Sequence, residues 1–151
     1  MIEVYTDGAC SSNGKNNANA GIGVYFGKND PRNVSKTITG KQTNNTAELK
    51  AIYEVYRILK KEIKQGEEVT IYTDSIYALR CVTTYGKKQN ENNWKKSIPN
   101  LELVKKIYKT FSKYPNVSFS HIKAHTNKKD KHSIGNYYAD KLAVEAIQIN
   151  S

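Results

Sequence analysis

The sequence predicts an α/β fold in which helices pack on both faces of a five-stranded mixed sheet. Three strand-like segments joined by short polar connections come first, which indicates an antiparallel meander. The hydrophobic period then changes from that of a strand to that of a helix, and two further strands alternate with helices. The 151 residues suffice for one substantial core, and no repeat or linker interrupts them. We therefore expect a single domain that spans residues 1–151.

The expected strands are short runs rich in β-branched and aromatic residues, bounded by turn-forming residues. The first run, IEVYTD, is followed by the turn-rich segment GACSSNGKNNANAG. We expect strands at residues 2–7, 21–27, 33–40, 68–74 and 116–123.

Four segments carry apolar residues at helical spacing. The longest runs from Asn45 to Lys64, and Gly66 supplies a stop signal after it. Pro99 lies near the start of another, where its missing amide hydrogen costs nothing. We expect helices at residues 45–64, 75–85, 98–111 and 137–147, and polar loops at residues 86–97 and 124–136.

The chain is strongly basic, with 24 Lys and Arg against 14 Asp and Glu and a net charge of +10. Such an excess favours a polyanionic partner, because cations that neutralise phosphates release condensed counterions. A generous coat of solvated lysines is the equally weighted alternative.

Targeting and redox signals are sparse. Two cysteines, Cys10 and Cys81, make neither a disulfide framework nor a zinc site. No apolar stretch approaches 18 residues, and the N-terminus lacks the features of a signal peptide. We expect an intracellular protein of cytoplasm or nucleus without membrane association, or one domain of a longer chain.

Three acidic residues each have an ordinary structural explanation. Asp7 closes the first strand, where Asp favours turns. Asp74 closes the fourth strand and could cap the helix expected to begin at Ser75. Glu48 follows Asn45 by three residues, the spacing of a capping box.

Together these acids predict a metal site. If the strands that carry Asp7 and Asp74 are adjacent and parallel, both carboxylates emerge at one edge of the sheet, with Glu48 above them. Asp140 lies inside an expected helix, where Asp has poor propensity and no capping role. Carboxylates this close repel unless they take up protons or hold a cation. Oxygen ligands without Cys suit Mg²⁺ or Mn²⁺.

Four motifs together resemble the type 1 ribonucleases H, most closely the eukaryotic-like branch. They are YTDGACSSNG, GKQTNNTAELKAI, IYTDSIYAL and IKAHTN followed by GNYYADKLA. The resemblance runs from about Ile2 to Ala146. A single TDG is weak evidence, whereas the ordered set of acids and the histidine is highly specific.

The resemblance implies a sheet of strand order 3-2-1-4-5 and an activity that cleaves the RNA strand of RNA–DNA hybrids. It implies that two divalent ions, Mg²⁺ with Mn²⁺ as a substitute, activate a water and stabilise the leaving 3′ oxygen, which yields 5′-phosphate and 3′-hydroxyl ends. The residues expected to hold these ions and to act in catalysis are Asp7, Glu48, Asp74 and Asp140. His125 matches the family's mobile histidine, although His132 lies in the same long loop and is the alternative.

The resemblance also assigns substrate contacts. It places recognition of the RNA 2′-hydroxyl at Cys10, Ser12, Asn13, Asn44 and Asn45. It places a DNA phosphate at Lys41, Thr43 and Asn100, with Lys41 where an Arg is usual, and a DNA channel at Tyr85, Trp94 and Ser97. Trp94 could instead anchor its basic segment to the body of the protein.

Two other functions remain possible from the sequence. One is a related nuclease or strand-transfer domain, such as the ribonuclease H portion of a reverse transcriptase. The other is a module that binds hybrids without cutting them, which the four intact carboxylates argue against. We expect a monomer.

Overall fold

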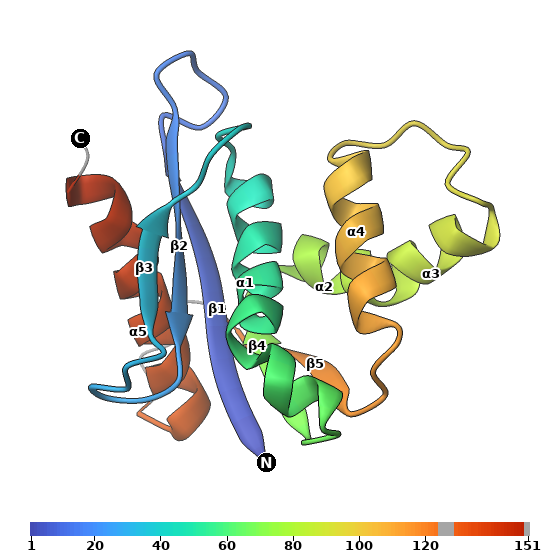
Figure 1. Ribbon diagram of the computed structural model, residues 1–151. Coiled ribbons are helices and arrows are strands. Elements are labelled where there is room, and N and C mark those ends of the chain that lie inside the picture. The colour runs from blue at the N-terminus through green and yellow to red at the C-terminus, as the bar shows by residue number, and fades with distance from the viewer. Residues whose placement is uncertain (124–128, 150–151) are drawn as a thin grey trace.

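The computed structural model describes residues 1–123 and 129–149. Within them, five strands form one sheet in the order β3-β2-β1-β4-β5, which confirms the expected order (Figure 1). β1 pairs antiparallel with β2, as β2 does with β3, while β1 with β4 and β4 with β5 are parallel. The strands are β1 (Ile2–Ser11), β2 (Asn19–Tyr25), β3 (Val34–Thr37), β4 (Val69–Thr73) and β5 (Val117–His121).

Helices cover both faces of this sheet, as expected. α1 packs against β1 and β2 on one face, and α5 packs against β1, β2 and β3 on the other (Figure 1). α2, α3 and α4 form a cluster beside α1. The bounds are α1 (Asn44–Lys64), α2 (Ile76–Val82), α3 (Thr84–Glu91), α4 (Leu101–Phe111) and α5 (Lys131–Ile149).

The main core lies between the sheet and α1. Val4 of β1 and Ile71 of β4 are fully buried, as are Leu49, Ile52 and Val55 of α1. With the almost fully buried Leu59, these helix residues recur at the three- and four-residue spacing that puts them on one face, which is why this face packs on the sheet. Burial of such side chains contributes about 1.5–3 kcal/mol each to folding.

Two helices extend into segments expected to be loops. α3 takes up residues 86–91, where only Gly86 and Gln89 are buried, so the sequence shows no apolar period there. α5 begins at Lys131, six residues before the expected start. Gly135 in its second turn discourages a helix assignment, but a Cβ at Gly135 would lie 2.5 Å from the Tyr5 ring. The glycine therefore permits close packing of α5 on β1.

β1 is also longer than expected. It continues past Asp7 to Ser11, which pairs with Asn19 of β2. The turn expected after Asp7 begins only at Ser12, whose φ is +55°. Asp7 therefore lies within a strand and not at its end, which corrects the expected boundary.

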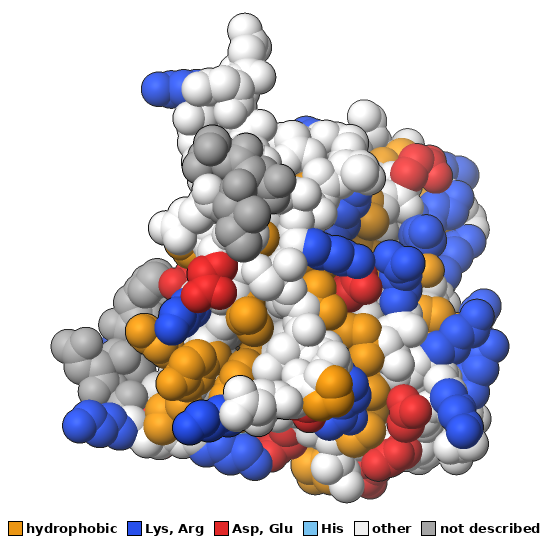
Figure 2. All heavy atoms as spheres, turned by 60° about the vertical axis from the view of Figure 1, so that its left-hand side comes forward, with side chains coloured by type: hydrophobic (Ala, Val, Ile, Leu, Met, Phe, Trp, Pro, Cys, Tyr) orange, Lys and Arg blue, Asp and Glu red, His pale blue; other side chains and the backbone are white. Residues whose placement is uncertain are grey.

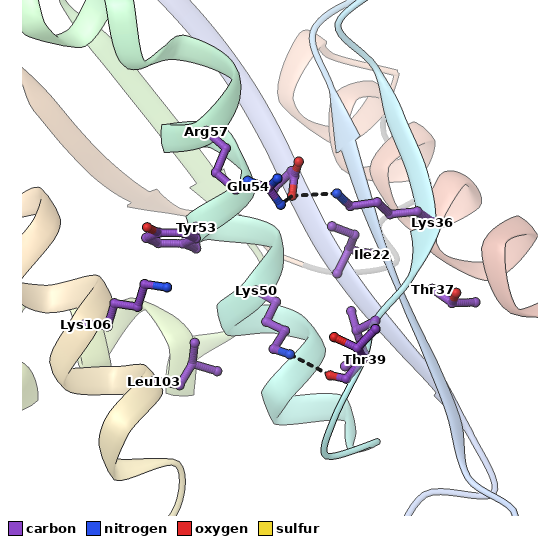
Figure 3. Close-up of a pocket in the computed structure, with 11 residues that line it drawn as sticks. Ile22, Lys36, Thr37, Thr39, Lys50, Tyr53, Glu54, Arg57, Leu103 and Lys106 are labelled. Atoms are coloured by element: carbon purple, nitrogen blue, oxygen red, sulfur yellow. Dashed lines mark hydrogen bonds and ion pairs between the residues drawn. The ribbon is translucent and has the colours of Figure 1, made fainter.

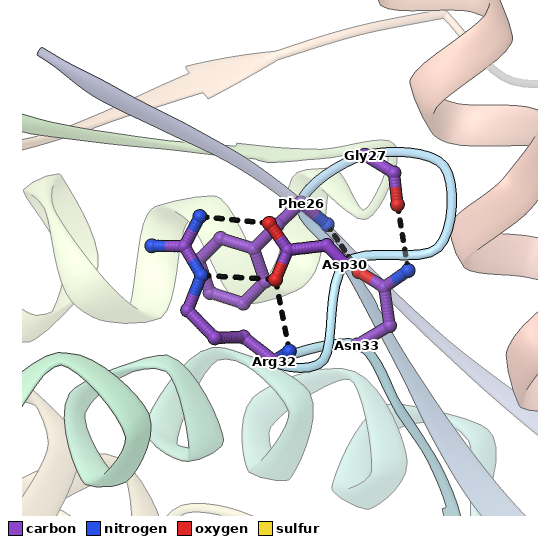
Figure 4. Close-up of polar contacts among 5 residues, drawn as sticks. All are labelled: Phe26, Gly27, Asp30, Arg32 and Asn33. Carbon is purple, nitrogen blue, oxygen red and sulfur yellow. Dashed lines mark hydrogen bonds and ion pairs between the residues drawn. The ribbon is translucent and has the colours of Figure 1, made fainter.

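A compact loop joins β2 to the edge strand β3 (Figure 4). The Arg32 guanidinium donates to both carboxylate oxygens of Asp30, at 3.0 and 2.8 Å, and lies 4.3 Å from the centre of the Phe26 ring. Asn33 accepts from the Phe26 amide at 2.7 Å and donates to the Gly27 carbonyl at 2.7 Å. These bonds satisfy the turn's polar groups and hold β3 against β2.

The surface carries the basic excess of the sequence. Figure 2 shows lysines and arginines on the side of the molecule where α5 and β3 lie, together with exposed hydrophobic side chains. The exposed hydrophobic residues of α5 are Ile134, Tyr137 and Tyr138. In the described part of the chain, no helix is both long and apolar enough to span a membrane.

Candidate active site

The parallel pairing of β1 with β4 brings two acids together. Thr6 of β1 pairs with Thr73 of β4, so Asp7 and Asp74 follow at the same level of the sheet. β4 ends at Thr73 while β1 continues to Ser11. From Asp7 onward, β1 therefore has no strand partner on the β4 side. The adjacency expected from the sequence is therefore present.

Glu48 reaches the same place from α1. The Gly8 amide donates to Glu48 Oε1 at 2.6 Å and to Asp7 Oδ1 at 2.9 Å. A Cβ at Gly8 would lie 2.5 Å from the backbone nitrogen of Glu48 and 2.7 Å from the carbonyl carbon of Ala47. Only glycine lets α1 approach β1 this closely. The sequence analysis did not single out Gly8, although a glycine inside a strand often marks such an approach.

The capping explanations for two of these acids are wrong. Thr43 caps α1 and accepts from the Thr46 amide at 3.1 Å, so Glu48 does not occupy the capping-box position. Ser75 caps α2 and accepts from the Ala78 amide at 3.0 Å, so Asp74 is not the cap. Neither acid is explained by the helix that it accompanies.

Four carboxylates surround one cavity. Ligand oxygens of Asp7, Glu48 and Asp74 all lie within 4.8 Å of one another. Asp140, from α5 on the opposite face of the sheet, lines the same cavity. The cavity has a volume of about 390 Å³ and is lined by Asp7, Gly8, Ala9, Cys10, Asn44, Glu48, Asp74 and Asp140.

The electrostatics of this cluster favour a bound cation. Asp7 and Glu48 are only 4% and 6% exposed. Burial raises the pKa of Asp7, and the charges of Glu48 and Asp74 raise it further. Burial and the charge of Asp74 also raise the pKa of Glu48 above its usual range. In the described ranges, no Lys, Arg or His forms a salt bridge with Asp7 or Glu48. A divalent cation with oxygen ligands would supply the missing positive charge.

The histidines occupy different surroundings. His132, in the first turn of α5, shares a 2.8 Å hydrogen bond with the Tyr5 hydroxyl and lies 4.5 Å from Tyr72 between ring centres. It does not line the carboxylate cavity. His125 lies outside the described residues. His121, which the sequence analysis did not consider, ends β5 with Nε2 at 3.3 Å from the Asp74 carbonyl oxygen.

Two of the five residues expected to read the RNA strand line the cavity, and the other three are their neighbours in the chain or are bonded to them. Cys10 and Asn44 line it. Asn13 accepts from the Asn44 amide at 3.0 Å, which links the turn after β1 to the start of α1. Ser12 and Asn45 are exposed next to these residues in the chain.

The expected DNA-phosphate residues meet where α1 and α4 begin. The Thr43 hydroxyl donates to Thr46 Oγ1 at 2.7 Å, and Thr46 Oγ1 donates to Asn100 Oδ1 at 3.1 Å. Asn100 also donates to the Tyr77 hydroxyl at 3.3 Å. Lys41, three residues before the first residue of α1, is exposed. Thr46 therefore links Thr43 to Asn100 where α1 and α4 begin.

The expected DNA-channel residues differ in exposure. Trp94 is only 8% exposed, and its indole nitrogen donates to Asn90 Oδ1 at 3.1 Å. Its ring packs near Tyr108 of α4, as the anchoring alternative expects. Tyr85 is half-buried in α3, and Ser97 is exposed.

Known proteins share both the sequence and the fold. The RNase H family profile matches residues 1–148. "Ribonuclease H" of Schizosaccharomyces pombe is 41% identical over 145 residues, which cover 93% of this chain and 50% of that protein. The chain thus spans about half the length of this relative.

Solved structures agree. The RNase H domain of PFV superposes with a TM-score of 0.74 at 25% identity, covering 98% of this chain and 94% of that domain. LC11-RNase H1, solved in complex with an RNA/DNA hybrid, gives a TM-score of 0.58 at 28% identity and covers 99% of both chains. With matching sequence, strand order and carboxylate cluster, the chain belongs to the RNase H family.

Proposed function

We propose that this chain is a metal-dependent endoribonuclease that hydrolyses the RNA strand of RNA–DNA hybrids and leaves 5′-phosphate and 3′-hydroxyl ends. The observation that carries the proposal is the convergence of four carboxylates, two of them buried, from β1, α1, α5 and the end of β4 on one cavity. Burial of so much like charge costs free energy. A catalytic metal site would explain why the fold bears this cost.

Asp7, Glu48, Asp74 and Asp140 would hold two divalent ions, Mg²⁺ or, as a substitute, Mn²⁺. Their donor set fits such ions, because all donors are oxygens and because burial and the neighbouring carboxylates, which raise the pKa of Asp7 and Glu48, make a bound cation favourable. When bound, the ions lower the pKa of a water and neutralise charge on the phosphate.

The protein's own groups would keep this site rigid. The Gly8 amide orients the carboxylates of Asp7 and Glu48 at the same time. Both side chains are buried, so water competes little for their oxygens. Such positioning before the substrate binds lowers the activation barrier, because the entropy of ordering the groups has already been lost.

The substrate is proposed from the net charge of +10 that the chain carries and from the relative that was solved with a bound hybrid. Amide and hydroxyl groups suit recognition of the RNA 2′-hydroxyl, since they both donate and accept hydrogen bonds. We assign this recognition to Cys10, Ser12, Asn13, Asn44 and Asn45. We assign a DNA phosphate to Lys41, Thr43 and Asn100.

We assign contact with the DNA strand further along to Tyr85 and Ser97, while the buried Trp94 supports the segment that carries Ser97. His125 is our candidate for proton transfer or product release. His132 is bonded to Tyr5, which supports a structural role for it.

We further propose that residues 1–151 act as a monomeric single domain inside the cell. A single continuous sheet and free thiols at Cys10 and Cys81 support this assignment.

The test is cleavage of labelled duplexes with and without Mg²⁺. The proposal predicts cutting of RNA paired to DNA and no cutting of RNA–RNA or DNA–DNA duplexes of the same sequence. It also predicts that EDTA stops the reaction and that added Mg²⁺ restores it. Equal cutting of all duplexes would indicate a nuclease of different specificity. Binding of hybrid without any cutting would indicate a binding module.

A further inference from the structure

A basic groove runs along the outer side of α1, between β3 and α4. Its volume is about 500 Å³. Figure 3 shows Lys106 reaching in from α4 and Lys36 from β3, with Lys50, Tyr53 and Glu54 of α1 between them. We call this the α1 groove and define it by Lys36, Lys50, Tyr53, Glu54, Arg57 and Lys106.

The groove holds an excess of positive charge. Four cations line it against the single carboxylate of Glu54, which leaves three positive charges, four minus one. Glu54 is 9% exposed and pairs with Lys36 at 2.9 Å and Arg57 at 3.4 Å. One carboxylate cannot neutralise two cations, so the groove attracts anions.

The other two cations are positioned by groups that leave their charge available. Lys50 donates to the Thr39 carbonyl oxygen at 2.6 Å, which is a neutral partner. The Lys106 ammonium lies 4.7 Å from the centre of the Tyr53 ring and is exposed. The flat ring holds this ammonium group over the groove without neutralising it.

The α1 groove continues from the proposed DNA-phosphate contact. Thr43 and Asn100 precede α1 and α4, the helices that carry Lys50 and Lys106. At 1.5 Å per residue, Lys50 lies about 10 Å along α1 from Thr43, and Lys106 about 9 Å along α4 from Asn100. The cations of the groove are therefore within the span of a few nucleotides of that contact.

We propose that the α1 groove binds the phosphate backbone of the DNA strand where it runs beyond the contact at Lys41, Thr43 and Asn100. The proposal rests on the proposed function, because it assumes that a hybrid is bound there. The groove would be a second binding site for the DNA strand, separate from the site where the RNA strand is cut. The groove would thus favour hybrids whose DNA strand extends past the paired region.

The test uses three substrates with one hybrid core: blunt, with a single-stranded DNA extension at the 5′ end, and with one at the 3′ end. Dissociation constants are measured in EDTA, so that nothing is cut. The test variant combines Arg57→Gln with Lys106→Gln, which leaves Lys36 paired with Glu54. The matched control combines Lys61→Gln with Lys113→Gln, two exposed lysines outside the groove.

We expect one of the two extensions to tighten binding by the wild-type protein. At 0.1 M salt, each single-strand phosphate contact contributes roughly fivefold, so the test variant should lose about five- to 25-fold on that substrate. Its salt slope there should be shallower by about 1.4, that is, two contacts of about 0.7 each. Its affinity for the blunt hybrid, and Mg²⁺-dependent cleavage of that hybrid, should stay close to the wild-type values.

Several results would overturn the inference. One is a test variant that responds to the extensions as the wild type does. Another is an equal loss in the control, which would mean that overall charge and not the groove matters. Preferential binding of an acidic peptide at the groove, with no gain from either DNA extension, would point to a protein partner. Absence of cleavage of the blunt hybrid by the wild type would instead refute the proposed function.

Discussion

Gly8→Ala tests whether the close approach of α1 to β1 builds the carboxylate site. The added Cβ would lie 2.5 Å from the Glu48 nitrogen, whereas ordinary contact begins at 3.4 Å. The backbone must therefore yield by about 0.9 Å, the difference between the two distances. Two of the three nearest atoms belong to the backbone of α1 at Ala47 and Glu48, which are buried, so they cannot simply move aside.

The size of the effect follows from this displacement. We expect overpacking to lower the free energy of unfolding by about 1–3 kcal/mol. Displacement of Glu48 by nearly an ångström should lower kcat on the order of 100-fold. Without a clash, Gly→Ala would stabilise the protein by about 0.4–1 kcal/mol, because alanine restricts the unfolded chain. The sign of the change therefore separates the two explanations.

Urea denaturation and kcat on a labelled hybrid in Mg²⁺ measure both effects. Gly27→Ala is the matched control, since a Cβ there would meet nothing within 4 Å and Gly27 does not have a positive φ. We expect wild-type turnover and unchanged or slightly higher stability for the control. A Gly8→Ala protein with wild-type kcat and undiminished stability would refute the reasoning.

Three further predictions follow from the charges. Asp74→Asn should abolish turnover but leave hybrid affinity in EDTA nearly unchanged, because a metal ligand is lost while the basic surface remains; wild-type kcat would show that Asp74 does not hold a metal. The affinity of the wild type for a blunt hybrid should fall with salt at a log–log slope of about −4 if about five phosphates are contacted, and a flat response from 50 to 200 mM would contradict this. Glu3→Gln should lower stability by less than about 1 kcal/mol at pH 7, because hydrogen bonds from Lys131 and Tyr72 hold the pKa of Glu3 below its usual value. That contribution is present above the usual pKa and is lost as the pH falls through the lowered one, so the difference from the wild type in urea should vanish in acid; a difference that persists there would contradict the assignment.

The topology and the central acids could be predicted from the sequence. Asp7 and Asp74 follow strand runs, and parallel pairing of those strands brings them together. The sequence alone does not decide whether Glu48 caps a helix or binds a metal. The capping role is excluded by the structure, in which Thr43 caps α1. Gly8 carries a clear local signal, but its reason, the backbone of α1, is 40 residues away.

Other features depend on tertiary contacts that a local pattern does not contain. α3 has too few buried residues to show a helical period. The start of α5 carries a glycine whose purpose is visible only against the Tyr5 ring. The α1 groove joins Lys36, Arg57 and Lys106, which no motif connects. Trp94 sits in a polar stretch and is nevertheless buried.

The central claim is that the cavity of Asp7, Glu48, Asp74 and Asp140 holds divalent cations. An anomalous-difference map from crystals soaked in Mn²⁺ tests it most directly, because the signal reports the metal itself. We predict two peaks in that cavity, each within bonding distance of carboxylate oxygens, and their loss in Asp7→Asn crystals. A cavity without a peak, in crystals where Mn²⁺ is bound elsewhere, would contradict the account.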